Sequence, residues 1–318
     1  MGKAMESTNT GMNSRKVNWM YIAMFVFYIA MSVGLSWYGN NYGFKSVYPL
    51  YLLNEMVYLV PMILFVVLSG SRFKEFLHFG RVKLSTVLMT VLFAFLCMPL
   101  TTVLNLVTQF FVENTVEANS GVIMQMPFAV AFLLIAVYAP VCEEIIFRGV
   151  TYEASKKGLN PFQAMCVSAV FFGLAHMNLN QAAYAFVLGL ILVLLKKATG
   201  SLWTTILFHV VFNGYNVGLL YLQPYLTKAT AETEEVVTAA EYRDVLLMGT
   251  SVYMVIALVT TALAGCVLAW IAGNEGRKEE LKDLWRKRKE GKGKILRIPF
   301  LLAVSLYLGM MVADALWL

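Results

Sequence analysis

Charged residues are scarce in this 318-residue chain: they make up 14% of it, whereas hydrophobic residues make up 59%. The mean hydropathy is +0.67. This balance excludes an ordinary soluble domain and predicts a polytopic helical membrane protein. The net charge is +6, but the positive residues lie in short loops between apolar runs, so we expect no nucleic-acid partner. The chain also lacks a glycine-rich phosphate loop, and we expect no nucleotide.

Cysteine and histidine are rare as well. The four cysteines match neither a disulfide framework nor a metal-binding spacing, and we interpret them as small buried hydrophobic side chains. The chain has three histidines. His78 lies in a basic loop, which is typical of a surface histidine, whereas His176 and His209 lie in apolar segments. The zinc-binding pattern His-Glu-x-x-His is absent.

Apolar runs long enough to cross a bilayer occur nine times. They cover residues 17–38, 46–69, 84–112, 122–147, 160–178, 181–198, 200–222, 246–272 and 298–318. We therefore predict an all-α fold of about nine transmembrane helices, with a core formed by helices four to seven. The expected divisions are a polar cytoplasmic tail (1–16), N-terminal transmembrane helices (17–121), the core (122–222), an outer loop (223–245), and C-terminal transmembrane helices (246–318) with a basic cytoplasmic loop (273–297).

The loops between these runs alternate in charge. Lysine and arginine gather at 15–16, 72–83, 156–157, 196–197 and 277–297. All of these segments fall on one side of the membrane if the amino terminus is cytoplasmic, and nine spans then place the carboxy terminus outside. The run at 277–294 is typical of a charged loop that rests on anionic membrane lipid; a regulatory or partner-binding helix is the alternative.

Glu143, Glu144 and Arg148 stand near the end of the fourth apolar run. A charge at bilayer depth costs several kcal/mol unless it is paired. Glu144 and Arg148 are four residues apart, so on a helix they share a face and can neutralise each other. Glu143 lies about 100° away on that helix and needs another partner. Pro140 predicts a kink just before it.

The polar residues that are costly to place in a membrane reach a similar depth in the predicted helices. Glu143 lies about 21 Å before Lys157, and His176 lies about 24 Å after Asn160, which begins the next helix. In the seventh span His209 lies about 13 Å from its start, with Asn213 on the same face. We interpret this layer as a catalytic site with a general base, a possible metal-ligand set and oxyanion donors. An ion-paired packing network and a transporter relay are the alternatives.

Asn54 and Glu55 in the second span are two further polar residues at membrane depth. They could line the same cavity, or they could make a hydrogen bond that packs the helices together.

The polar residues of the core form three motifs: Glu-Glu-x-x-x-Arg-Gly at 143–149, Phe172-x-x-x-His176 and His209-x-x-x-Asn213. These motifs resemble those of the CPBP family, which comprises type II CaaX prenyl endopeptidases and bacterial proteases linked to bacteriocin processing and self-immunity. The resemblance covers residues 126–221 and implies an all-helical intramembrane endopeptidase whose site lies in a cavity reached from the cytoplasm. It further implies a multi-pass protein in the plasma membrane of a bacterium, with a peptide or protein substrate.

The resemblance also assigns roles to these residues. Glu143 would activate the attacking water and His176 would hold it, while His209 and Asn213 would stabilise the oxyanion. Glu144 and Arg148 would form a supporting pair, and Phe172 would pack against the site. Zinc on Glu143, His176 and His209 and a metal-free glutamate mechanism both remain open. The alternatives to a peptidase are a non-catalytic bacteriocin-immunity or peptide-binding protein and a proton- or metal-coupled transporter.

Overall fold

The computed structural model describes residues 11–44, 46–114, 119–230, 239–290 and 293–317, and within these ranges all regular elements are helical. The predicted all-α class is therefore confirmed. The separate long helices are α1 (Ser14–Tyr42), α2 (Tyr48–Leu68), α3 (Leu84–Thr108), α9 (Pro161–Ala175), α10 (Leu179–Thr199), α11 (Leu202–Thr230), α12 (Ala239–Asn274) and α14 (Ile298–Trp317). The short helices α6 (Phe128–Ala131), α7 (Ala139–Glu144) and α8 (Tyr152–Ser155) are joined by π-helical turns into one 28-residue helix, Phe128–Ser155.

Eight helices among the described residues are long and apolar enough to cross a membrane. The predicted fifth span, residues 160–178, is the 15-residue helix α9. At 1.5 Å per residue α9 is about 22 Å long, which is shorter than the hydrocarbon core of a bilayer. The predicted count of about nine is thus corrected to eight helices of full length and one shorter helix.

The first turn of α9 is fixed by a capping box. Asn160 Oδ1 accepts the N–H of Gln163 at 2.9 Å, and Gln163 Oε1 accepts the N–H of Asn160 at 3.1 Å. Pro161 occupies the first helical position, where its missing N–H costs nothing. The helix that was predicted to begin at Asn160 therefore has this residue as its N-cap.

The chain reverses sharply after α9. His176 ends the helix, and Met177 adopts a left-handed backbone conformation with φ 51°. Asn178 Oδ1 then caps α10 by accepting the N–H of Gln181 at 2.9 Å. This tight turn between α9 and α10 fixes His176 at the tip of the pair.

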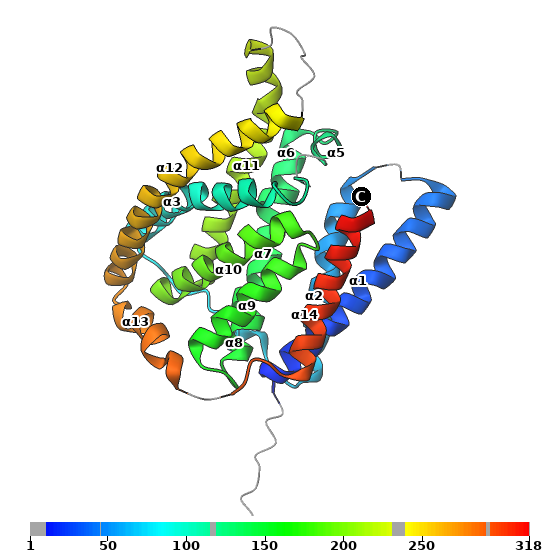
Figure 1. Ribbon diagram of the computed structural model, residues 1–318. Helices are drawn as coiled ribbons and strands as arrows, with labels where there is room; N and C mark the ends of the chain where they lie inside the picture. Colours follow the sequence, from blue (N-terminus) through cyan, green and yellow to red (C-terminus); the bar gives the residue numbers. More distant parts are fainter. Residues whose placement is uncertain (1–10, 45, 115–118, 231–238, 291–292, 318) are drawn as a thin grey trace, which may run out of the picture.

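The helices form one bundle, with the core elements in its middle (Figure 1). Helix α14 packs against α1, and α2 lies beside α1, on one side of the bundle. Helix α12 packs against α3 on the other side. Between them lie α9, α10, α11 and the Phe128–Ser155 helix, which carry the predicted site.

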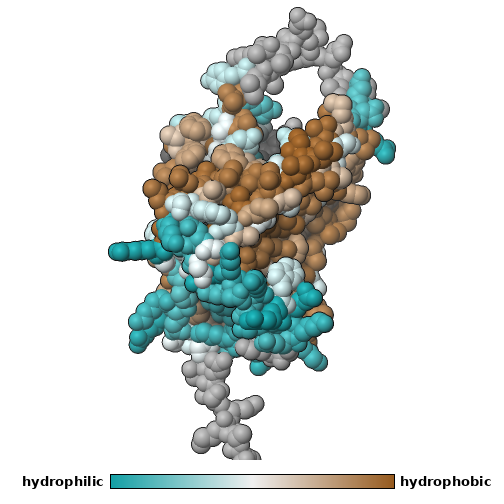
Figure 2. Space-filling view, turned by 90° about the vertical axis from the view of Figure 1, so that its left-hand side faces the viewer, coloured by the Kyte–Doolittle hydropathy of each residue, from teal (hydrophilic) through white to brown (hydrophobic). Residues whose placement is uncertain are grey.

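The basic segments meet at one end of the bundle, where α1 begins; we call it the basic end. Ser201 Oγ donates to the carbonyl of Gly80 at 2.7 Å, and Lys157 Nζ lies 3.0 Å from Glu75 Oε2. The amphipathic helix α13 (Lys278–Arg286) lies at the same end. Figure 2 shows this hydrophilic end below a broad hydrophobic band. The predicted grouping of the basic loops on one face is therefore confirmed.

Helices extend further than expected into the predicted polar segments. Helix α11 continues through Pro224 to Thr230, and α12 begins at Ala239, so most of the expected outer loop at 223–245 is helical; residues 231–238 lie outside the described chain. Helix α1 begins within the expected tail, at Ser14, because Asn13 Oδ1 accepts the N–H groups of Arg15 and Lys16. The basic loop at 273–297 contains α13.

Candidate active site

The two adjacent carboxylates lie at the end of α7, between π-helical turns at Phe132–Tyr138 and Ile145–Thr151. Pro140 explains the first widened turn. Proline has no N–H to donate, so it cannot continue a regular ladder of hydrogen bonds. The neighbouring Ala139 N–H donates five residues back, to the carbonyl of Leu134. The predicted kink at Pro140 takes the form of a π-helical turn, a feature often found at functional sites.

The same turn anchors Asn213. The carbonyl of Ile135 lies five residues before Pro140, which cannot donate to it. Asn213 Nδ2 of α11 donates to this carbonyl instead, at 3.0 Å. One hydrogen of the Asn213 amide is thereby used to hold the side chain in place. The second hydrogen of the same nitrogen is not used in this bond, and Asn213 lines the cavity described below.

Glu144 and Arg148 form the predicted pair. Arg148 Nη1 donates to Glu144 Oε1 at 3.0 Å, and both side chains are fully buried. The guanidinium carbon of Arg148 lies 4.0 Å from the ring centroid of Phe172, which adds a cation–π contact. The charges of Glu144 and Arg148 compensate each other. The buried pair can therefore hold neighbouring side chains such as His209 in place.

His209 of α11 lies between the two carboxylates. Its Nδ1 is 3.0 Å from Glu144 Oε1, and its Nε2 is 3.5 Å from Glu143 Oε2. Glu144 accepts from Arg148 as a carboxylate, so Nδ1 of His209 is the donor toward it. This hydrogen bond turns Nε2 toward Glu143 and fixes the ring.

His176 is oriented by its own helix. Its Nδ1 lies 2.8 Å from the carbonyl oxygen of Phe172 and donates to it, which leaves Nε2 as an acceptor in the neutral ring. The Phe172 ring contacts both imidazoles edge to face, with centroid distances of 5.1 Å to His176 and 5.7 Å to His209. Phe172 therefore packs against the site, in the place that was predicted for it. The phenol of Tyr58 also donates to the carbonyl of Ala175, at 2.6 Å, and so secures the end of α9.

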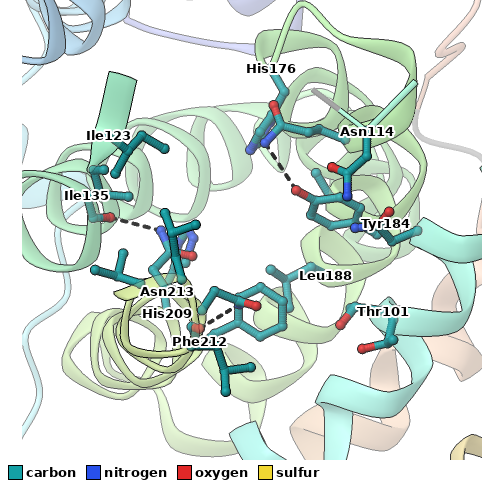
Figure 3. Close-up of a pocket in the computed structure, with 18 of the residues that line it drawn as sticks. Thr101, Asn114, Ile123, Ile135, His176, Tyr184, Leu188, His209, Phe212 and Asn213 are labelled. Atoms are coloured by element: carbon teal, nitrogen blue, oxygen red, sulfur yellow. Dashed lines mark hydrogen bonds between the residues drawn. The ribbon is translucent and has the colours of Figure 1, made fainter. Parts of the chain in front are cut away.

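A cavity of about 760 Å³ brings the predicted residues together (Figure 3). Glu143, His176, His209 and Asn213 all line it. The side chain of Glu143 is 19% exposed, whereas that of Glu144 is fully buried. The two neighbouring carboxylates therefore differ: Glu143 meets the cavity, and Glu144 stands behind it with Arg148.

Other residues on the cavity wall were not singled out from the sequence. Uncharged polar side chains line it from three helices: Thr101, Thr102, Asn105, Gln181, Tyr184 and Asn216. Single Thr, Asn, Gln and Tyr residues in apolar runs are common, and only the packing shows that they face one space. Spacing of three or four residues along α10 and α11 could have grouped some of them.

Lys196 is another residue whose place was not predicted. It was interpreted as part of a basic loop, yet it is buried, and its Nζ donates to the carbonyl of Arg148 and to Glu153 Oε1. The bond to Glu153 is 2.7 Å long. Lys196 thus holds the backbone of the widened turn that carries Arg148.

Asn54 and Glu55 do not line this cavity. Glu55 is buried, and Asn54 Nδ2 donates to its Oε1 at 3.3 Å. Asn54 faces a separate hollow between α1 and α2. This hydrogen bond joins two adjacent residues of α2 rather than two helices, so it is neither of the two roles predicted for the pair.

The predicted zinc ligands do not form a metal-binding group. Among the described residues, no set of three or more His, Cys, Asp or Glu side chains is placed to hold a metal ion. His209 Nδ1 is bound to Glu144, whereas its Nε2 lies 3.5 Å from Glu143 Oε2. Zinc coordination needs a lone pair from each ligand at one centre. The described side chains, as placed, are not gathered at such a centre.

The cavity lies inside a bundle of apolar helices and is lined by a carboxylate, two imidazoles and an amide. This is the site expected of an intramembrane hydrolase. Residues 125–215 match the sequence model of the family described as Type II CAAX prenyl endopeptidase Rce1-like. All three motifs lie within that segment. The resemblance to the CPBP family is thereby confirmed for this part of the chain.

A relative from Bacillus subtilis (strain 168) is similar over a comparable length. It is named "Putative membrane peptidase YdiL" and is 28% identical over 128 residues, which cover 39% of this chain. The aligned part spans about half of that relative, 51% of its length. No solved structure matches the chain. The family model thus matches the central part of the chain, and the relative carries the name of a membrane peptidase.

Proposed function

We propose that this protein is an intramembrane endopeptidase that hydrolyses a peptide bond with a water activated by Glu143. The observation that carries this proposal is the difference between the two adjacent carboxylates. Glu144 is buried and neutralised by Arg148, whereas Glu143 faces the cavity beside two histidines. A general base needs access to the proton that it removes, and of these two carboxylates Glu143 has that access.

The reaction follows from the contacts of each side chain. A water in the cavity donates one hydrogen bond to Glu143 and another to Nε2 of His176, whose Nδ1 is held by Phe172. Glu143 removes a proton as the water oxygen attacks the carbonyl carbon of the substrate. The C–N bond then breaks, and Glu143 gives that proton to the leaving amine.

The negative oxygen of the tetrahedral intermediate needs hydrogen-bond donors. Asn213 supplies the second N–H of its anchored amide. His209 supplies Nε2–H when both ring nitrogens carry protons, because Nδ1–H stays on Glu144. Donors that are fixed before the reaction stabilise an oxyanion without reorganisation.

The experiment compares Glu143→Gln with a matched control, Glu279→Gln, in purified full-length protein. Glu279 is an exposed glutamate on α13, far from the cavity, so the same chemical change there should leave activity intact. Cleavage of a peptide library is mapped by mass spectrometry. Loss of general-base catalysis should slow Glu143→Gln by a factor of about 10² to 10⁴. Equal cleavage by the two variants would overturn the proposal. Binding of peptides without cleavage by the unmodified protein would favour a peptide-binding protein instead.

A further inference from the structure

The lining of the active-site cavity lies in one half of the bundle. On α11 the lining positions begin at His209, and none of them lies in the first seven residues, which are nearest the basic end. On α3, which also begins at the basic end, they begin at Thr101, near the far end of the helix. The Phe128–Ser155 helix runs in the opposite direction, and there the lining positions stop at Glu143. Three helices therefore place the cavity on the side away from the basic loops.

The hairpin of α9 and α10 gives the same result. Helix α9 rises from the basic end, and its lining positions begin at Phe172, in its last turn. Helix α10 returns toward the basic end, and its lining positions stop at Leu188, halfway along it. All five helices agree in direction.

Between the residues that line the cavity and the basic end, the bundle is closed. Glu144, Arg148 and Thr205 are fully buried there. Two aromatic rings, Phe147 and Phe208, fill the same layer and are also buried. Closely packed side chains leave no passage for a peptide from this side.

Exposure rises in the other direction along α11. His209 is buried, Asn213 is half-buried, and Asn216 and Gln223 are exposed, although all four line the cavity. The mouth of the cavity therefore lies near Gln223. Asn114 and Ser120, from the segments that follow α3, line the cavity at this end as well.

We infer that the active site receives its substrate from the face opposite the basic loops, and that this substrate is a peptide segment exposed on that face. The second part rests on the proposed endopeptidase function. The wall of the entry combines apolar side chains such as Leu188 and Phe212 with uncharged hydrogen-bonding groups, and it has Glu143 as the charge at its base. The hydrogen-bonding groups include Thr101, Asn105, Gln181 and Tyr184. Such groups suit the N–H and C=O groups of an extended polypeptide.

The distribution of charge indicates which side of the membrane the mouth of the cavity faces. Basic loops of membrane proteins remain in the cytoplasm, so the mouth of the cavity faces away from it. The substrate is then a secreted peptide or the outer segment of a membrane protein. This is the reverse of the cytoplasmic entry that the family resemblance implies.

The test is the side from which a cavity residue reacts with a membrane-impermeant maleimide. The full-length protein, with alanine at its four cysteines, carries Asn216→Cys as the cavity reporter. Asn41→Cys, exposed at the end of α1, marks the outer face, and Lys282→Cys, exposed on α13, marks the basic face. Each variant is labelled in right-side-out and in inverted membrane vesicles.

We expect Asn216→Cys to label in the vesicles that label Asn41→Cys and to lose labelling in those that label Lys282→Cys. Labelling together with Lys282→Cys would overturn the inference, and so would reaction with a membrane-permeant maleimide alone, which would indicate entry from lipid. Gln223→Cys, nearer the mouth, is the second reporter should Asn216→Cys fail to fold. Labelling does not depend on cleavage, so an inactive protein that labels from the outer face would refute the endopeptidase function and leave the entry side standing.

Discussion

Removing Arg148 should destabilise the protein more than almost any other single change in the site. The guanidinium is fully buried and lies 3.0 Å from a carboxylate that is equally buried, so Arg148→Met leaves Glu144 charged in a place without water. Breaking a buried pair in this way costs about 3–5 kcal/mol. His209 Nδ1 still donates to Glu144 and compensates part of that loss, so we expect a value of about 3 kcal/mol, at the lower end of the range.

The double variant Glu144→Gln/Arg148→Met separates charge from packing. It removes both charges at similar volume, and replacing both members of a buried ion pair is often neutral. We therefore expect it to recover most of the stability that Arg148→Met loses. Unfolding free energies of the wild type, both single variants and the double variant, measured by denaturant titration in mixed micelles, give the coupling energy of the pair. If the double variant is as unstable as Arg148→Met, Glu144 does not require Arg148 for neutralisation and the reasoning fails.

Three further predictions concern the reaction. Asn213→Ala should lower kcat by a factor of about 10² to 10³ with little change in KM, because it removes one oxyanion donor; a change confined to KM would contradict that role. Chelation by phenanthroline should leave cleavage unchanged, because no three metal-ligating side chains of the described residues are gathered at one centre; an activity that is lost with chelator and restored by added zinc would contradict this. Lys196→Met should lower kcat by releasing the carbonyl of Arg148, whereas Lys196→Arg, which keeps a charged donor, should restore most of it; equal losses in the two variants would indicate a role in packing alone.

Local spacing predicted the parts of the site that depend on one helix. The Glu144–Arg148 pair follows from a separation of four residues, and the position of His176 follows from the length of α9. The cavity mouth could not be predicted in this way. It depends on which faces of five helices meet, and apolar runs that are hydrophobic all round do not reveal those faces.

Two expectations failed for identifiable physical reasons. Residues 160–178 have the composition of a span, but His176 ends the helix and Asn178 caps the next one, so α9 stops short. The apolar run ends at residue 222 and a loop was expected after it, yet α11 continues through Pro224, because a single missing N–H does not end a helix that is held by its neighbours. Tyr221, whose hydroxyl donates to the carbonyls of Ile123 and Met126, is one such contact.

The tight turn after α9 has a consequence for the role of water in the cavity. Because α9 is about 22 Å long, the reversal at Met177 occurs at a depth where lipid offers its peptide groups no hydrogen bonds. Irregular backbone is tolerated at such a depth where it borders water or protein, and His176 at the start of the turn borders the cavity. Water in the cavity therefore has two roles. It is the reactant in the proposed hydrolysis, and it sustains the turn that presents the His176 imidazole.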